Sequence, residues 1–183
     1  KLAAGEIIGT FAHSEKTTFP NESGINVNFK SGKISGKKVA VPDGDIANFA
    51  LVTAKSDKNQ IGFYLVDLSS NGVEINSLDT FDPSRSHADI VFENVEARTL
   101  NNDAWSDIEK LLDQSAVLFA FEQVGGAEAA MNQAKDYAMG RYAFGRAIAS
   151  FQAIKHKVAD MYISLQLARS NCYYGAWALS NDA

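Results

Sequence analysis

Side chains that can do chemistry are few in this sequence, and they are widely separated. His13 and Ser14 lie together near the N-terminus, Glu122 and Glu128 lie in a long apolar-rich stretch, and Arg141 follows it. Taken alone, each has an ordinary structural role: a strand or turn serine, a surface or core histidine, solvated or packing glutamates, and an arginine that caps a helix or stays in solvent. Residue type alone therefore indicates no particular reaction.

Several classes of function are disfavoured by the composition. No G-x-G-x-x-G or Walker motif occurs, so a nucleotide would have to be bound by other means. The net charge of −5 argues against nucleic acid and anionic membranes as partners. Cys172 is the single cysteine, which excludes an internal disulfide and fits a reducing compartment, the cytoplasm or the mitochondrial matrix. No apolar run reaches the roughly 18 residues of a membrane span.

The 183 residues are 46% hydrophobic and 21% charged, enough for a core in one domain or two small ones. The sequence opens without Met and runs directly into strand-like residues, so we expect it to begin within a longer protein.

Residues 1–100 predict an antiparallel β-sandwich or barrel. Short apolar runs are separated by turn-forming residues, and no helical pattern lies between them. The expected strands are 24–29, one beginning at Ile34, 38–41, 49–55, 61–68, 73–78 and 89–92.

Residues 101–183 predict a long helical hairpin from an up-and-down bundle. The first helix is expected over Asp103–Met139, capped by Asn102 or Asp103, and the second begins near Ser150. Gly125 and Gly126 fall inside the first helix, where two glycines cost on the order of 1–2 kcal/mol. We therefore expect another helix or a ligand to approach closely there.

The second helix carries an apolar stripe at alternating steps of three and four residues, which predicts core packing in a bundle. Its members are Phe151, Ile154, Val158, Met161, Leu165, Ala168 and Cys172. Two helices alone leave apolar faces uncovered, so the bundle is expected to be incomplete and to need helices from further sequence or another subunit.

The most specific pattern lies at the junction of the two helices. Residues 141–161 closely resemble the acyl-CoA dehydrogenase signature R-x-x-F-G-x-x-[IL]-x-x-[FH]-Q-x-[IV]-x-x-x-[LV]-A-[DE]-M, and the likeness continues to Ser170. Residues 36–56 resemble the family segment G-x-K-x-x-I-x-x-G-x-x-A-x-x-x-x-V-x-A-[RK]-[ST], and 89–95 resemble [VL]-x-F-[ED]-[DN]-V. The chain thus resembles the middle β-domain and the first part of the C-terminal helical domain of that family.

This resemblance implies a dimer or tetramer with FAD between β-domain and bundle, each FAD also touching a neighbouring subunit. Arg141 would pair with the pyrophosphate of the neighbour's FAD, Phe144 would pack on that cofactor, and Gln152 would hydrogen-bond it. A guanidinium fork suits phosphate oxygens and stays charged.

Two further positions are carried over from the resemblance. Phe11-Ala12-His13-Ser14-Glu15 occupies the place of the family motif [YF]-x-x-[ST]-E-P, which holds the isoalloxazine. Ser14 is the residue expected to contact it, with Phe11 and His13 nearby. Asp113, at the start of the hairpin, is expected to accept a hydrogen bond from the substrate.

The sequence also departs from the family pattern. The W-I-[TS]-N-G motif that packs on flavin is replaced by Ala40-Val41-Pro42-Asp43-Gly44, and residues 16–21 replace a P-x-x-G-S-D loop. Ala116 stands where many members have an Arg that contacts CoA. Ser115 stands where some members carry the catalytic Glu, so we expect no catalytic base in this chain.

The resemblance implies α,β-dehydrogenation of an acyl-CoA thioester in fatty acid metabolism, with electrons passed to an electron-transfer flavoprotein. One alternative is a non-catalytic or half-site partner subunit of a hetero-oligomeric acyl-CoA dehydrogenase, which the departures favour. Another is a relative that acts on a non-CoA substrate or uses oxygen.

Overall fold

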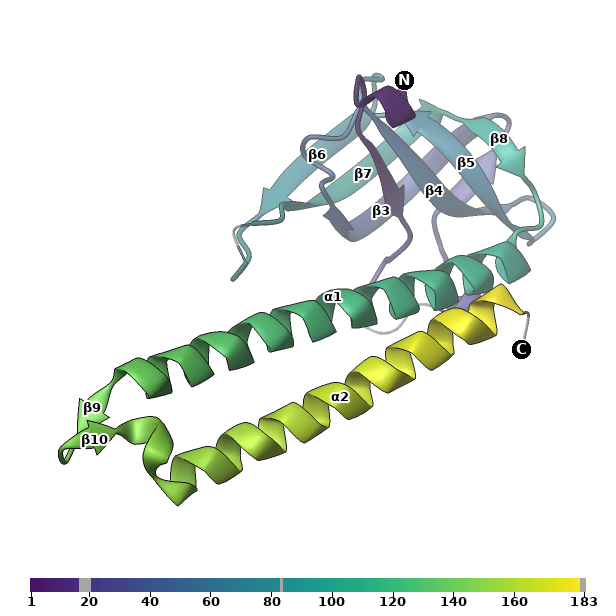
Figure 1. The fold of residues 1–183 in the computed structure, drawn as a ribbon. Coiled ribbons are helices and arrows are strands. Elements are labelled where there is room, and N and C mark those ends of the chain that lie inside the picture. Colours follow the sequence, from purple (N-terminus) through teal and green to yellow (C-terminus); the bar gives the residue numbers. More distant parts are fainter. Residues whose placement is uncertain (17–20, 83, 182–183) are drawn as a thin grey trace. The chain divides into compact units, whose positions relative to one another are not determined.

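The computed structural model describes residues 1–16, 21–82 and 84–181 (Figure 1). The chain forms two compact units, Lys1–Asp107 and Ile108–Ala183. The first is built of strands and the second of helices. Each is described by itself.

Eight strands among the described residues of the first unit form one sheet, in the order β6-β7-β3-β2-β4-β5-β8 with β1 also alongside β4. The strands are β1 (Gly9–Ala12), β2 (Asn28–Lys30), β3 (Lys33–Pro42), β4 (Phe49–Ser56), β5 (Ile61–Asp67), β6 (Val73–Leu78), β7 (His87–Glu96) and β8 (Arg98–Asn101). A short 3-10 turn, η1 (Leu2–Ala4), precedes β1, and a second one, η2 (Glu22–Gly24), lies between β1 and β2.

The predicted class, a β-domain followed by a long helical hairpin, is confirmed, but the sheet is mixed rather than wholly antiparallel. β1 and β2 both pair with β4 in parallel, with Gly9 opposite Phe49 and Asn28 opposite Lys55. The remaining pairs are antiparallel, and the strand order stays open at β6 and β8, so the described strands do not close into a barrel. Turn residues indicate pairing between neighbours in sequence, so they could not reveal these long-range parallel pairs.

One face of the sheet forms the core. In β4, for example, Ala50, Val52 and Ala54 are fully buried, as the two-residue side-chain period of a strand requires. Tyr64 of β5 is also buried, and its ring stacks on Phe29 at 4.1 Å between centroids.

The strand expected over 24–29 is wrong in its bounds. Ile25 and Val27 are buried and their neighbours are exposed, so the alternation is real, yet only Asn28–Lys30 is a strand. The reason is that the N–H groups of Asn26 and Val27 donate to the Glu15 carboxylate, at 2.7 and 3.1 Å, instead of to another strand.

The second unit is a pair of long helices, α1 (Trp105–Gly140) and α2 (Gln152–Ser180). A hairpin of two short strands, β9 (Tyr142–Ala143) and β10 (Arg146–Ala147), and the turn η3 (Ile148–Ser150) connect them. The first helix begins two residues later than Asp103, whose carboxylate instead accepts a hydrogen bond from Gln60 at 3.4 Å.

The contact between the helices is small. Val124, Leu165 and Cys172 form a buried cluster, whereas Met161 of the predicted stripe is 43% exposed. An apolar groove with a cavity volume of about 1060 Å³ runs along the two helices beside this cluster. Many large apolar side chains stay exposed, among them Leu118, Tyr162, Ile163, Leu167, Tyr173 and Trp177.

The close approach expected at Gly125 and Gly126, by another helix or a ligand, is not made within the described chain and stays a prediction. A Cβ added at Gly125 or Gly126 would meet nothing within 4 Å, so nothing in the described chain packs closely on them. The close approach is at Gly175 of α2, where a Cβ would lie 3.1 Å from Cγ2 of Val117.

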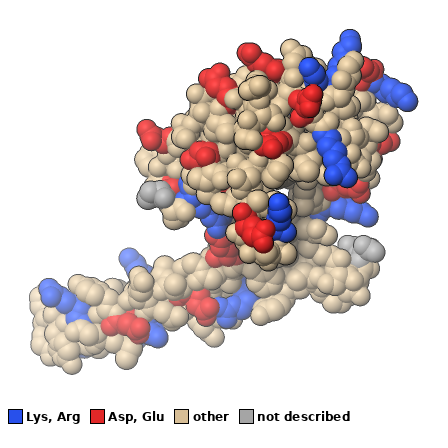
Figure 2. Space-filling view, turned by 90° about the horizontal axis from the view of Figure 1, so that it is seen from above, with Lys and Arg blue, Asp and Glu red and all other residues tan. Residues whose placement is uncertain are grey.

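The described helices include none that is both long and apolar enough to cross a membrane. On the face of the strand unit that Figure 2 shows, acidic and basic side chains are interspersed rather than gathered by sign.

Candidate functional site: a clamped segment after strand β1

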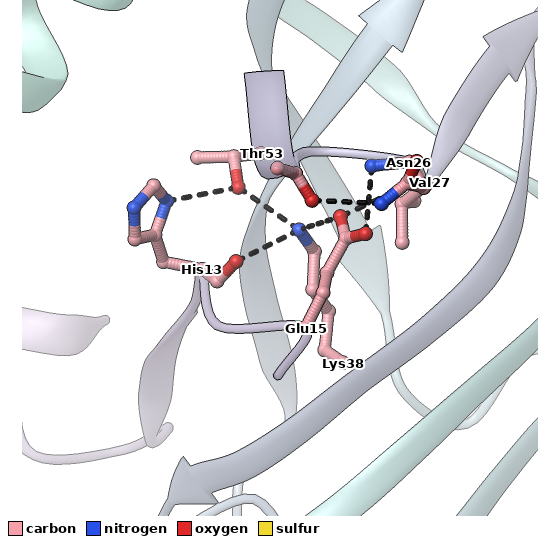
Figure 3. Close-up of polar contacts among 7 residues, drawn as sticks. His13, Glu15, Asn26, Val27, Lys38 and Thr53 are labelled. Carbon is pink, nitrogen blue, oxygen red and sulfur yellow. Dashed lines mark hydrogen bonds and ion pairs between the residues drawn. The ribbon is translucent and has the colours of Figure 1, made fainter. Parts of the chain in front are cut away.

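The segment His13-Ser14-Glu15 leaves the end of β1 and is held by main-chain and side-chain bonds on every residue (Figure 3). The carbonyl of His13 accepts from Lys38 Nζ at 2.9 Å, and that of Ser14 accepts from the N–H of Val39 at 2.8 Å. The Glu15 carboxylate accepts from Lys38 Nζ at 2.7 Å. Two consecutive residues of β3, Lys38 and Val39, therefore form hydrogen bonds with all three residues of the segment.

Lys38 is the centre of this arrangement. Its side chain is 0% exposed, and its third hydrogen bond goes to Thr53 Oγ1 of β4 at 3.1 Å. Burial lowers the pKa of Lys38 to about 8, an effect that the Glu15 carboxylate opposes. Burial raises the pKa of Glu15, but Lys38 and the N–H groups of Val27 and Asn26 outweigh it and lower that pKa overall.

His13 lies in an aromatic environment beside this ion pair. Its ring stacks on Phe11 at 5.4 Å, and Trp105 lies 6.4 Å away, centroid to centroid. Its Nδ1 lies 3.1 Å from Thr53 Oγ1, whereas Nε2 is buried and has no hydrogen-bond partner in the described part of the chain. Burial, followed by the charge of Lys38, lowers the pKa of His13 to about 4, so the ring is neutral at pH 7.

The structure thus brings Phe11, His13 and Ser14 together, as the sequence predicted, without testing their role. Ser14 is half-buried, and no hydrogen bond to its hydroxyl is found among the described residues. That hydroxyl can serve a ligand. Residues 17–20, most of the expected substrate loop, lie outside the described residues.

The altered flavin motif has an unusual backbone. Ala40 has φ of 48°, in the left-handed region that side chains disfavour, and the register of β3 breaks between Lys38 and Val41. The N–H of Ala40 donates to Asp89 at 3.0 Å, which holds this conformation. Ala40 and Pro42 are exposed, so this edge presents little side-chain surface where the family pattern has a Trp.

In the helical unit, the hairpin between the helices positions Arg141. Its N–H donates to the Tyr137 carbonyl at 2.9 Å and its own carbonyl accepts from Ile148 at 2.8 Å, so the backbone is fixed on both sides. The side chain is exposed, and no ion pair to it is found within the described chain.

Phe144 lies at the tip of this hairpin. Phe144 and Gly145 have φ of 54° and 77°, as a two-residue turn with both φ positive requires. Phe144 is 96% exposed and touches Phe151 edge-on at 6.4 Å. Arg146 stacks over Phe151 at 4.0 Å, and Gln152, the first residue of α2, is exposed.

The residues expected near substrate lie on α1. Asp113 is exposed. The Ser115 hydroxyl donates to the Leu111 carbonyl at 2.7 Å, so it is satisfied within the helix. Ala116 lines the apolar groove. Position 115 itself thus carries a hydroxyl and not the carboxylate of a catalytic base.

Sequence reasoning missed Lys38 and Thr53 as parts of the site. The available signal was the two-residue period of β3, which puts Lys38 on the face of buried Ile34 and exposes Lys37. No group of three or more His, Cys, Asp or Glu residues suitable for a metal occurs in the described ranges.

The chain resembles known proteins along most of its length. Residues 102–183 match the family model described as acyl-CoA dehydrogenase, C-terminal domain. The probable acyl-CoA dehydrogenase YngJ of Bacillus subtilis is 31% identical over 96% of this chain and 50% of its own length. The caffeyl-CoA reductase-Etf complex subunit CarC of Acetobacterium woodii is 30% identical over 81% of this chain and 42% of its own.

The fold of a solved structure agrees. A glutaryl-CoA dehydrogenase of Mycobacterium smegmatis, in complex with FADH2, superposes with a TM-score of 0.89 at 21% identity, over 98% of this chain and 49% of its own. A mixed sheet followed by two long helices is thus the fold of about half of that chain. The chain belongs to the acyl-CoA dehydrogenase family of oxidoreductases, and it spans about half the length of the curated relatives that it matches.

Proposed function

We propose that the protein carrying this chain is an FAD-dependent acyl-CoA dehydrogenase that introduces an α,β double bond into an acyl-CoA thioester. The observation that carries the proposal is the hairpin Arg141–Ala147. A rigid backbone there presents an exposed guanidinium and, at its tip, a phenylalanine in a disfavoured conformation. Strain of about 1–3 kcal/mol at an exposed side chain favours a binding role.

The residues present fit FAD in two places. In the helical unit, Arg141 offers several N–H donors to a pyrophosphate. Phe144 offers an apolar ring, and Gln152 offers an amide that can donate and accept hydrogen bonds. In the strand unit, the half-buried Ser14 hydroxyl has no hydrogen-bond partner in the described chain, and the partly buried ring of Phe11 lies near it. We infer that Arg141, Phe144 and Gln152 bind the FAD of a neighbouring subunit, in a homodimer or homotetramer.

Bound flavin would accept the hydride that leaves the β-carbon of the substrate. The chain's own part is to hold and orient: Ser14 with a hydrogen bond and Phe11 with an apolar ring at the cofactor, and Asp113 with an acceptor for the substrate. The described residues of α1 offer no base at position 115, so proton removal from the α-carbon is assigned to sequence outside this chain.

An electron-transfer flavoprotein is the proposed electron acceptor, and the name of the A. woodii relative, a subunit of a complex with Etf, supports this. The single cysteine, Cys172, is buried and reduced, which is compatible with the proposed cytoplasmic or mitochondrial-matrix location. The proposed role of the protein is in fatty acid metabolism.

The test is flavin retention by the complete protein. Purified with added FAD and then desalted, it should keep close to one FAD per protomer, with the absorbance of bound flavin. A colourless protein after desalting would contradict the proposal.

A second candidate is the half-site partner subunit of a hetero-oligomeric dehydrogenase. Ser115 and Ala116 lack the charged groups of the family pattern, and Ala40 and Pro42 lack the ring that packs on flavin. Under this alternative the protein alone would bind no FAD, whereas co-purification with the product of a neighbouring gene would yield a flavin-loaded pair.

A further inference from the structure

The buried side chain of Lys38 has no role in the proposed function so far. An ammonium has three hydrogens and no acceptor, and those of Lys38 are all used, on the His13 carbonyl, the Glu15 carboxylate and Thr53 Oγ1 (Figure 3). Burying a cation costs free energy unless all of its donors are paired, and the donors of Lys38 are all paired.

The two bonds of Thr53 indicate the direction of the next bond. Thr53 Oγ1 accepts from Lys38, and His13 Nδ1, 3.1 Å away, is the one acceptor found for its hydroxyl hydrogen among the described residues. Nδ1 is then the acceptor, and the proton of the neutral ring must sit on Nε2. Lys38 thereby fixes the tautomer of a ring that it does not touch.

The bonds to His13 and Glu15 fix the backbone. They bracket Ser14, whose carbonyl is held by the next residue of β3, Val39, at 2.8 Å. Glu15 extends the grip to the N–H groups of Asn26 and Val27. The segment is therefore held by hydrogen bonds from the chain itself, with no contribution from a ligand.

We propose that Lys38 is a positioning residue that clamps residues 13–15, presents the Ser14 hydroxyl to the cofactor site and holds the buried ring of His13 as its Nε2–H tautomer. The inference rests on the proposed function in one respect, that Ser14 lies against FAD. The clamp and the tautomer do not depend on it.

The first experiment reads the tautomer in the complete protein without ligand. Long-range proton–nitrogen NMR correlations on nitrogen-15-labelled histidine, assigned with His13→Gln, should place the His13 proton on Nε2. Thr53→Ser keeps the hydroxyl and should leave this unchanged. Lys38→Met lets Thr53 Oγ1 accept from the ring instead, so the Nδ1–H form should appear in that variant.

The second experiment measures FAD affinity by titration of flavin fluorescence. Lys38→Met should weaken FAD binding about tenfold, equivalent to about 1.4 kcal/mol, because the segment must then be ordered on binding. Lys37→Met, its exposed neighbour on the same strand, should stay within about twofold of the original protein. If Lys38→Met does not fold, as judged by circular dichroism, Thr53→Val replaces it with a loss of about threefold.

The outcomes separate the two claims. An Nδ1–H tautomer in the original protein, or an unchanged tautomer in Lys38→Met, overturns the inference about Lys38. So does equal FAD affinity of the original protein and the variants. If the original protein binds no FAD, the proposed function fails, and the tautomer measurement alone decides the role of Lys38.

Discussion

At the scale of single residues, one buried ion pair organises the strand unit's candidate site. Lys38 and Glu15 are separated by 2.7 Å with almost no exposed surface, and their other bonds reach three different segments. Replacing one partner would leave the other charged and buried, which typically costs about 3–5 kcal/mol. The pair therefore acts as a fixed point for the chain around it.

His13 should make the protein sensitive to acid. Its pKa is about 4 in the fold and near 6.5 when exposed, so between these values the unfolded chain binds more protons. The free energy of unfolding should therefore fall as the pH falls from about 6.5 to 4, by about 1–3 kcal/mol from this residue. Urea denaturation of His13→Leu across this range should give a flatter profile.

His156 provides the matched control, because its side chain is exposed on α2. His156→Gln should keep the pH profile of the original protein. A His13→Leu profile as steep as the original would mean that His13 takes up its proton in the fold as readily as in the unfolded chain.

Arg141 should contribute to FAD affinity through charge and geometry. A charge-assisted hydrogen bond is worth about 1.5–3 kcal/mol, so Arg141→Gln should weaken FAD binding about tenfold to a hundredfold. Isothermal titration with FAD measures this. Arg169→Gln is the control, since Arg169 pairs with Glu128 at 2.7 Å along the helices; equal losses in both variants would refute a specific role for Arg141.

At the scale of elements, the sequence predicted what short-range patterns encode. The two-residue alternation of apolar side chains predicted the strands, and the change to a helical period predicted the helices. Turn-forming residues predicted most ends of these elements. What it could not supply were pairings over long separations: the parallel strands beside β4, and the Glu15 carboxylate that takes the N–H groups of residues 26 and 27. The residue types at the candidate site were predictable from a motif. The lysine that clamps them was missed, although the two-residue period of β3 puts it on the buried face.

The helical hairpin gives a test of its own packing. A Cβ at Gly125 would meet open space, so Gly125→Ala should raise the free energy of unfolding of the helical unit by about 0.5–1 kcal/mol through helix propensity alone. Gly175→Ala should gain less or lose stability, because its Cβ would press on Val117 at 3.1 Å. Thermal unfolding followed by circular dichroism compares the two.

A loss of stability in Gly125→Ala would contradict the expectation of open space. It would place another helix, from further sequence or a second subunit, against α1 at this glycine, as the sequence first predicted.

At the scale of the whole molecule, each of the two units carries side chains that we propose for FAD binding. The strand unit supplies a pre-ordered segment with a hydroxyl and a fixed imidazole, and the helical unit supplies an exposed arginine and aromatic tip. The two-helix unit exposes a long apolar groove and many large apolar side chains, features that mark interaction surfaces. Both features fit a chain that works within a larger assembly.

The most direct test of the account is an anaerobic titration of the complete, flavin-loaded protein with a series of acyl-CoA thioesters of increasing chain length. We predict that at least one of them bleaches the oxidised flavin absorbance, with formation of the corresponding enoyl-CoA. Flavin absorbance that stays unchanged with every thioester, although dithionite reduces it, would contradict the assignment of acyl-CoA dehydrogenation.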